Sequence, residues 1–313
     1  MAKNNKPAAK VAPKPTLRLW LAGARLRTLP LAVAPVLLGA CMPLAYRSTQ
    51  GHFSILLTLL ALSVAVLLQV GVNFANDYSD GIRGTDANRV GPMRLVGSGA
   101  VAPAAVKRAA FACFGLAAAS GLAMIAIDLA AGITGALWLI AVGALAILAA
   151  WFYTGGKKPY GYAGLGDLAV FVFFGLVATV GTSYVQLGYL DQTSVILGAA
   201  AGFFACAVLM VNNLRDRVND QAVGKKTLSV RVGARWSKVL FLLDLWLPFA
   251  LISLVATVFP SAVLGWFAVL LVGPATIVFL AAKSPKELIL VLKLSSYAAL
   301  MFALLELLAF SIQ

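Results

Sequence analysis

The chain has 313 residues, of which 61% are hydrophobic and 12% charged, and it carries a net charge of +14. Soluble domains of this size have about a quarter charged residues, so the composition excludes an ordinary soluble protein and indicates a membrane protein. The single histidine argues against haem, histidine-bound zinc and Ser-His-Asp catalysis, and leaves catalysis to carboxylates, lysine, arginine and tyrosine. Cys41, Cys113 and Cys206 lie far apart in apolar runs, which indicates buried small side chains and not a disulfide or zinc framework.

The chain begins with a basic segment and continues as a series of apolar blocks. Residues 1–24 are expected to form a disordered basic cytoplasmic tail, because the first part mixes Lys, Ala, Pro and Asn without an apolar core. Residues 25–313 hold apolar blocks of about 18–25 residues, each long enough to cross about 30 Å of hydrocarbon. They predict one all-α domain of nine transmembrane helices, at about 28–46, 53–77, 105–127, 132–153, 165–190, 193–215, 236–258, 261–282 and 287–311.

The segments between these helices differ sharply in charge. Of the 25 Lys and Arg residues, 24 fall on one side: in the N-terminal tail, after the second, fourth and sixth helices, and around the start of the ninth. Only Arg47 falls on the other side. The positive-inside rule makes the basic side cytoplasmic, with the N-terminus inside and the C-terminus outside. The sequence thus predicts a multi-pass protein of the cytoplasmic (inner) membrane that contacts the lipid bilayer, and its net charge requires no nucleic acid as partner.

Two polar segments on the cytoplasmic side hold five of the eleven acidic residues. The first reads N73-F-A-N-D-Y-S-D80-G-I-R-G-T-D86, and the second reads N212-N-L-R-D-R-V-N-D220-Q-A-V-G. In each, an Asn stands four residues before the first Asp, a second Asp follows after three or four residues, and x-x-x-Gly comes next. If both segments are helical, one face of the first helix carries Asn73, Asp77 and Asp80. One face of the second helix carries Asn212, Asp216 and Asp220.

Clustered carboxylates near hydrocarbon repel one another and favour a bound cation. Oxygen ligands that leave room for water and substrate phosphate are typical of Mg²⁺. We therefore expect Mg²⁺ ions to be held by Asp77, Asp80, Asp86, Asp216 and Asp220. The alternative is that both segments are solvated polar ends paired with nearby Arg and Lys; the matched spacing of the two segments favours the metal site.

Basic side chains near these segments fit a diphosphate, because Arg and Lys bind phosphate oxygens. A short segment between the fourth and fifth helices, Y153-T-G-G-K157, adds a tyrosine and a lysine. Asp167 opens the fifth helix, either to position an acceptor or to cap the helix. The expected catalytic residues are Asp77, Asp80, Asp216, Asp220 and Lys157, and the expected substrate-binding residues are Asn73, Arg94, Tyr153, Asp167, Asn212, Arg215 and Lys225.

Together these motifs resemble those of the intramembrane aromatic prenyltransferases, over essentially the whole chain from Arg25 onward. The resemblance is carried by N-D77-Y-x-D80, by Y153-x-x-x-K157 and by N-N-L-R-D216-x-x-x-D220-x-x-x-G-K. Gly84 with an acid two residues later, the run G91-P-M-R94-L-V and the run G164-L-G-D167 are typical of the branch that acts on dihydroxynaphthoate and not on 4-hydroxybenzoate.

The resemblance implies a helical bundle around a central cavity, roofed by the two aspartate segments and open sideways to lipid. It also implies Mg²⁺-dependent transfer of a polyprenyl group from polyprenyl diphosphate to 1,4-dihydroxy-2-naphthoate, with loss of CO₂, giving demethylmenaquinol. Aromatic side chains such as Phe171, Phe173, Phe174 and Tyr184 either shield the allylic cation or simply pack. Another aromatic acceptor, such as 4-hydroxybenzoate or homogentisate, or a terpene-cyclising reaction would use the same ionisation step.

Two rival functions fit the motifs less well. A transporter places polar groups in the middle of its spans, whereas these acids lie at helix ends on one face of the membrane. An intramembrane phosphatidyl-group transferase shares the start of its signature with D77-Y-S-D80-G. In that signature an Ala-Arg pair and a second pair of aspartates follow immediately, and neither follows in this sequence.

Overall fold

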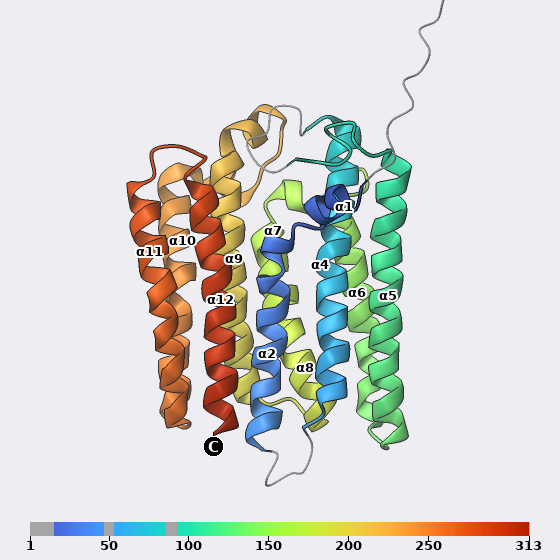
Figure 1. Cartoon of the computed structure of the whole chain (residues 1–313), viewed down its shortest axis with the longest axis vertical. Helices are drawn as coiled ribbons and strands as arrows, with labels where there is room; N and C mark the ends of the chain where they lie inside the picture. The colour runs from blue at the N-terminus through green and yellow to red at the C-terminus, as the bar shows by residue number, and fades with distance from the viewer. Residues whose placement is uncertain (1–15, 47–52, 86–92, 313) are drawn as a thin grey trace, which may run out of the picture.

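The computed structural model of the chain describes residues 16–46, 53–85 and 93–312. Within these residues every regular element is a helix, which confirms the predicted all-α class. The long helices stand side by side and nearly parallel, and the segments that follow α4 and α9 lie at the same end of the bundle (Figure 1).

The described helices follow one another along the chain with short connections. Their bounds are α1 Leu17–Ala24, η1 Leu26–Thr28, α2 Pro30–Ala45, α4 Ile55–Arg83, α5 Pro103–Ala130, η2 Thr134–Leu137, α6 Trp138–Phe152, η3 Tyr160–Ala163, α7 Gly166–Val170, η4 Phe171–Val177, α8 Ala178–Leu187, α9 Gln192–Ala222, α10 Leu228–Ala256, η5 Pro260–Ala268, α11 Val269–Ala281 and α12 Leu288–Ser311. Both α4 and α9 extend beyond the predicted bounds, so Asp77, Asp80, Asp216 and Asp220 lie on helices and not in loops.

Eight helical segments of the described chain are long and apolar enough to cross a membrane, and α1–η1 with α2 gives a ninth that is bent by 50°. The prediction of nine spans is confirmed when this bent pair counts as one span. Only 11% of the apolar window within Thr134–Phe152 is buried, and 22% of the windows in α4 and α5. Such wide apolar surfaces require lipid around them. The chain is a multi-pass membrane protein.

The prediction of a disordered tail over residues 1–24 is wrong for its last eight residues, which form α1. The sequence LRLWLAGA ends in three small residues, of which Gly23 and Ala24 are buried. Trp20 packs edge-on against Phe74 of α4, with ring centroids 5.6 Å apart. This contact packs α1 against α4, and it was not predicted from the sequence. The tail before residue 16 lies outside the described residues.

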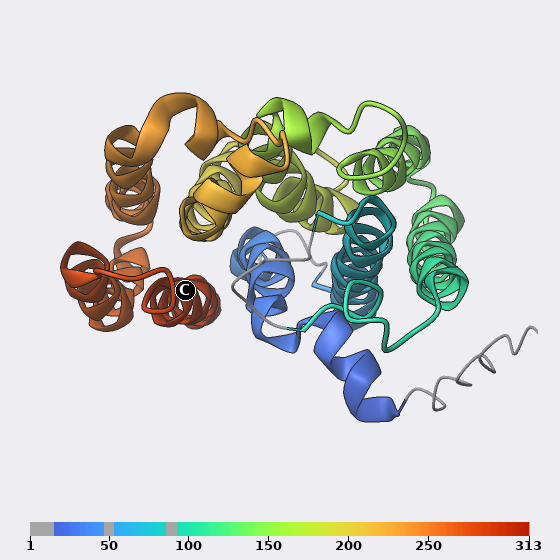
Figure 2. The same cartoon turned by 90° about the horizontal axis from the view of Figure 1, so that it is seen from above.

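Buried apolar side chains form two separate cores. The larger joins α2, α9, α10, α11 and α12, and the smaller joins α1, α4, α5, α6 and the segment around Leu95. Seen from above, α10–α12 lie at one end of the molecule and α4–α6 at the other (Figure 2). The functional cavity lies between the two cores.

Candidate active site

A cavity of about 390 Å³ runs between the two cores. The helices α2, α4, α5, α6, α8 and α9 and the π-helix η4 all contribute to its wall. Its charged lining residues are Arg25, Asp80, Arg94, Asp216, Asp220 and Lys225. The rest of the wall is mostly apolar, with Val64, Leu68, Val72, Met124, Val142, Phe173 and Phe174 among the lining side chains. One cavity therefore combines a group of charges with an extended apolar wall.

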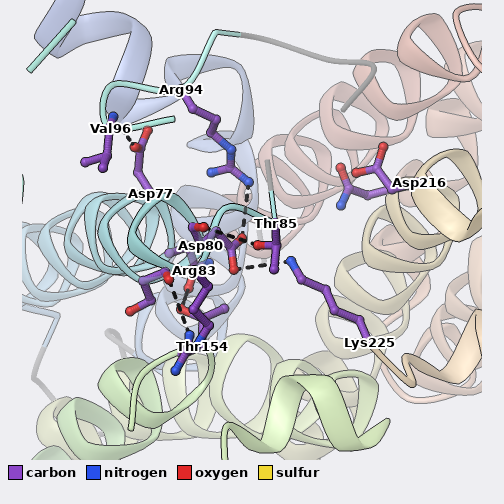
Figure 3. A network of polar contacts seen from close by, with 12 residues as sticks. Asp77, Asp80, Arg83, Thr85, Arg94, Val96, Thr154, Asp216 and Lys225 are labelled. Carbon is purple, nitrogen blue, oxygen red and sulfur yellow. Dashed lines mark hydrogen bonds and ion pairs between the residues drawn. The ribbon is translucent and has the colours of Figure 1, made fainter. Parts of the chain in front are cut away.

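Asp80 lies at the centre of the charged group and is only 4% exposed. Its Oδ1 accepts a hydrogen bond from the Tyr162 hydroxyl and lies 3.2 Å from Lys225 Nζ. Its Oδ2 lies 3.8 Å from Arg94 Nη2. Figure 3 shows these cations reaching Asp80 from different segments, with Asp216 on a separate helix facing them. The predicted substrate-binding residues Arg94 and Lys225 thus meet the predicted metal ligand Asp80.

Both aspartate helices end in the same way, which explains the Gly that follows each segment. Gly84 and Gly224 have φ of 70° and 77°, a conformation that glycine adopts without strain. The carbonyl of Asp80 accepts the N–H of Thr85 at 3.2 Å, and that of Asp220 accepts the N–H of Lys225 at 2.8 Å. The second of these caps places Lys225 at the cavity, next to the aspartates of α9.

Both segments contribute Asn and Asp side chains with the same spacing to the cavity. The pattern Asn-x-x-x-Asp occurs twice in α4, ending at Asp77 and at Asp80, and the pair that lines the cavity together is Asn76 and Asp80. Asn212 and Asp216 of α9, which have the same spacing, also line the cavity. Residues three apart on a helix differ by about 60° in direction, so the side chains of Asp77 and Asp80 can contact different parts of the protein.

The expectation that Asp77 is a catalytic metal ligand is not supported by its contacts. Asp77 is 1% exposed, and its two carboxylate oxygens accept the backbone N–H groups of Leu95 and Val96 at 2.8 and 2.9 Å. Figure 3 shows the side chain directed toward Val96 and away from the cations around Asp80. Asp77 does not line the cavity. It holds the segment after residue 92 against α4, and Arg94 of that segment thereby reaches Asp80.

On α9, Asp216 forms a buried bidentate ion pair with its neighbour in sequence, Arg215. Arg215 Nε and Nη2 lie 2.8 and 2.7 Å from the two Asp216 oxygens. Nη2 also donates to Asn212 Oδ1 at 2.8 Å. Asp216, Asp220 and Asn212 line the cavity but Arg215 does not. Arg215 thus orients Asp216 and Asn212, and its predicted role in substrate binding stays a prediction.

Two further predicted site residues lie outside the cavity. Lys157 is exposed in the segment between α6 and η3, so a catalytic role for it is not supported. Asp167 of α7 is half-buried next to α9, where its backbone carbonyl accepts a hydrogen bond from Cys206 Sγ at 3.3 Å. Neither carboxylate oxygen of Asp167 has a hydrogen-bond partner among the described residues, and the side chain neither caps α7 nor lines the cavity. Asp86 lies outside the described residues.

Asn73 lines the cavity, but its amide serves a packing role. Its Nδ2 donates to the carbonyl of Ala24 at 3.0 Å and thereby ties α4 to the end of α1. Thr28 donates to the carbonyl of Arg25 at 2.9 Å and accepts Gln69 Nε2 at 3.1 Å. Arg25, Thr28 and Gln69 line the cavity as well, and sequence reasoning missed them because they stand apart from the aspartate segments.

The segment between α6 and α7 supplies three tyrosines to the cavity: Tyr153, which was predicted, and Tyr160 and Tyr162, which were not. Burial raises the pKa of Tyr160 to about 12. Burial, and then the neighbouring Asp80 carboxylate, raise the pKa of Tyr162 above its ordinary value, so its hydroxyl remains a hydrogen-bond donor. Arg83 fastens this segment to α4 by donating to the carbonyls of Thr154 and Gly156.

The residues at the charged end fit a magnesium ion that is completed by substrate. Asp80, Asp216 and Asp220 offer hard carboxylate oxygens in one cavity, beside the amides of Asn76 and Asn212. Among the described residues, no three side chains of His, Cys, Asp or Glu lie close enough together to form a metal site on their own. Mg²⁺ commonly binds one or two carboxylates together with substrate phosphates, and needs no complete protein cage.

The sequence of the chain is similar to the sequences of known proteins. The profile of the UbiA prenyltransferase family matches residues 32–287. The chain is 45% identical over 287 residues to the 1,4-dihydroxy-2-naphthoate octaprenyltransferase of Mycobacterium tuberculosis, covering 91% of this chain and 94% of the relative. It is 43% identical over 217 residues to the Escherichia coli protein of the same name, covering 68% of each.

Solved structures show the same fold. A UbiA homologue from Archaeoglobus fulgidus, described as bound to DMAPP and Mg²⁺, superimposes with a TM-score of 0.57 at 14% identity, covering 94% of this chain and 99% of that one. The helical arrangement is thus shared even where few residues are identical.

Proposed function

The chain belongs to the UbiA prenyltransferase family, and we propose that it transfers a polyprenyl group from polyprenyl diphosphate to 1,4-dihydroxy-2-naphthoate, with Mg²⁺ as cofactor. Loss of the acceptor carboxyl group as CO₂ gives demethylmenaquinol. The names of relatives that are 45% and 43% identical support this acceptor. The DMAPP and Mg²⁺ bound to the A. fulgidus homologue support a prenyl diphosphate and Mg²⁺ as ligands here.

The observation that carries the proposal is the division of one cavity into a charged and an apolar part. A prenyl diphosphate has the same division, with a highly charged head and a hydrocarbon tail. Lys225 and Arg94 are placed to bind phosphate oxygens, and Asp80, Asp216 and Asp220 to hold the metal. The bound metal supplies charge stabilisation to the leaving diphosphate. Apolar side chains such as Leu68, Met124 and Val142 bury the prenyl tail away from water.

The same cavity contains groups that suit the allylic cation and the acceptor. Phe173 and Phe174 present aromatic rings that can stabilise positive charge on the allylic carbon. Phe171 instead packs against Phe203, and Tyr184 packs against Trp138. The contacts of Phe171 and Tyr184 therefore favour a packing role for these two side chains. Gln69 has a buried Oε1 with no partner among the described residues, which offers an acceptor for a ring hydroxyl of the naphthoate.

Carboxyl-labelled 1,4-dihydroxy-2-naphthoate should release labelled CO₂ in a one-to-one ratio with prenylated product. Attack of the ring on the allylic cation at the carboxyl-bearing carbon is completed by loss of CO₂, so no strong base is required to remove a ring proton. The measurement uses purified protein, one prenyl diphosphate and several acceptors in parallel. Label retained in the product, or a preference for 4-hydroxybenzoate, would contradict this acceptor and leave the prenyl transfer itself intact.

We further propose that the aspartate segments face the cytoplasm in the inner membrane, because 24 of the 25 Lys and Arg residues fall at that end of the predicted spans. Lys157→Cys and Gln192→Cys place exposed thiols at opposite ends of the bundle. In intact cells, an impermeant thiol reagent should label only the Gln192→Cys protein. The native cysteines are buried or half-buried, and a variant without them serves as background. Labelling of Lys157→Cys alone would reverse the orientation.

A further inference from the structure

Tyr162 lies where three segments of the charged end meet. Its hydroxyl donates to Asp80 Oδ1 of α4. Its ring centroid lies 4.6 Å from Lys225 Nζ and 5.5 Å from Arg83 Cζ, so cations from two different segments contact the same ring. Its backbone carbonyl accepts the N–H of Lys226 at 2.9 Å. One residue of η3 thus contacts the end of α4 and the segment that follows α9.

The contacts of Tyr162 differ in how much they can change when a diphosphate binds. Lys225 has a long flexible side chain and three donors, so its ammonium group can turn from Asp80 to a phosphate oxygen. The Tyr162 ring has few rotatable bonds and is held among its neighbours, so its hydroxyl remains in place. The hydroxyl therefore continues to hold the Asp80 carboxylate after Lys225 has moved to the substrate.

We propose that Tyr162 is a positioning residue for the metal–diphosphate group of the substrate: its hydroxyl orients the Asp80 carboxylate toward the cavity, and its ring keeps the Lys225 ammonium within reach of the phosphates. This role rests on the proposed function, because it concerns the binding of a prenyl diphosphate. Without the hydroxyl, Lys225 is the remaining donor to Asp80 Oδ1 among the described contacts. The carboxylate and the diphosphate then compete for the same ammonium group.

The chain offers a matched control two residues away. Tyr160 lies in the same short helix, and its hydroxyl donates to the backbone carbonyl of Ala149 at 2.8 Å. Tyr162→Phe and Tyr160→Phe therefore each remove one hydroxyl and one hydrogen bond from the same segment. Only the first removes a hydrogen bond to a charged group of the site.

Titration calorimetry with an unreactive prenyl thiolodiphosphate and Mg²⁺, without acceptor, measures the proposed effect directly. Loss of a hydrogen bond to a charged group corresponds to a rise in Kd of about tenfold or more for Tyr162→Phe. Tyr160→Phe should raise the Kd much less, because the Tyr160 hydroxyl bonds to the Ala149 carbonyl and not to a charged group of the site. Tyr162→Leu also removes the ring beneath Lys225 and should weaken binding further. The melting temperatures of the two Phe variants should be similar, and the KM for the acceptor should not change in Tyr162→Phe.

Unchanged Kd in Tyr162→Phe, or an equal rise in both Phe variants, would overturn the positioning role; the equal rise would assign the effect to the fold of the segment. If the unmodified protein fails to bind the analogue, the proposed function is wrong and the role of Tyr162 falls with it. If the analogue binds as expected but dihydroxynaphthoate is not prenylated, only the choice of acceptor is wrong.

Discussion

Asp80→Asn should lower the rate of prenyl transfer by about 10²–10³-fold, the size of effect seen when one electrostatic group that stabilises a transition state is removed. The substitution keeps the shape of the side chain, and its amide oxygen can still accept from Tyr162. It removes the anionic oxygen that we propose as a ligand for the metal, at a position that is 4% exposed and between two cations. Initial rates measured over a range of Mg²⁺ concentrations test the effect.

The folded state of the Asp80→Asn protein is checked by its melting temperature and by size-exclusion chromatography. Lys157→Ala provides the matched activity control, because the exposed Lys157 side chain lies outside the cavity and its loss should leave the rate unchanged. A rate for Asp80→Asn near that of the unmodified protein at low Mg²⁺ would show that Asp80 is not a metal ligand.

Asp77→Ala should lower the stability of the protein and leave the dependence of the rate on Mg²⁺ unchanged. It leaves the buried N–H group of Leu95 and the half-buried N–H group of Val96 without their carboxylate partner. An unsatisfied buried donor costs about 1–3 kcal/mol, so the loss of both hydrogen bonds should lower the free energy of unfolding by about 2–6 kcal/mol. Thermal unfolding and limited proteolysis between residues 93 and 101 measure the change.

Ser98→Ala is the control for Asp77→Ala, because Ser98 is an exposed residue of the same segment and its hydroxyl bonds only to nearby backbone. Its loss should change the free energy of unfolding by less than about 0.5 kcal/mol. If Asp77→Ala instead leaves the melting temperature unchanged and raises the Mg²⁺ requirement, Asp77 is a ligand after all and its backbone contacts are incidental.

The lengths of α4 and α9 show why the predicted helix ends fell short. Hydropathy decreases at the first Asn of each segment, and the predicted helices ended near Asp77 and Arg215. In the structure both helices continue for roughly two further turns to Arg83 and Ala222. The polar turns are stable because their side chains face the charged part of the cavity and because a glycine cap closes each helix. A hydropathy pattern does not contain that information.

The positions of Lys157 and Lys225 show a second limit of prediction from the sequence. The spacing Y153-x-x-x-K157 placed a lysine near the site, but the backbone turn between α6 and η3 leaves Lys157 exposed. Lys225 occupies the position beside Asp80 because the cap after α9 directs it there. In the same way, Tyr162 reaches Asp80 from a segment that Arg83 fastens to α4.

The sequence by itself determined the membrane class, the number of spans, the prenyltransferase family and the two helices that carry the aspartates. These properties follow from the length of apolar runs and from residue spacing along one chain, both of which are local. Only the tertiary structure decided which aspartate on α4 faces the cavity, that Arg215 supports Asp216 from behind, and that Tyr162 joins Asp80 to Lys225. These assignments depend on how segments up to about 150 residues apart pack against one another, because a direction on a helix has meaning only relative to its neighbours.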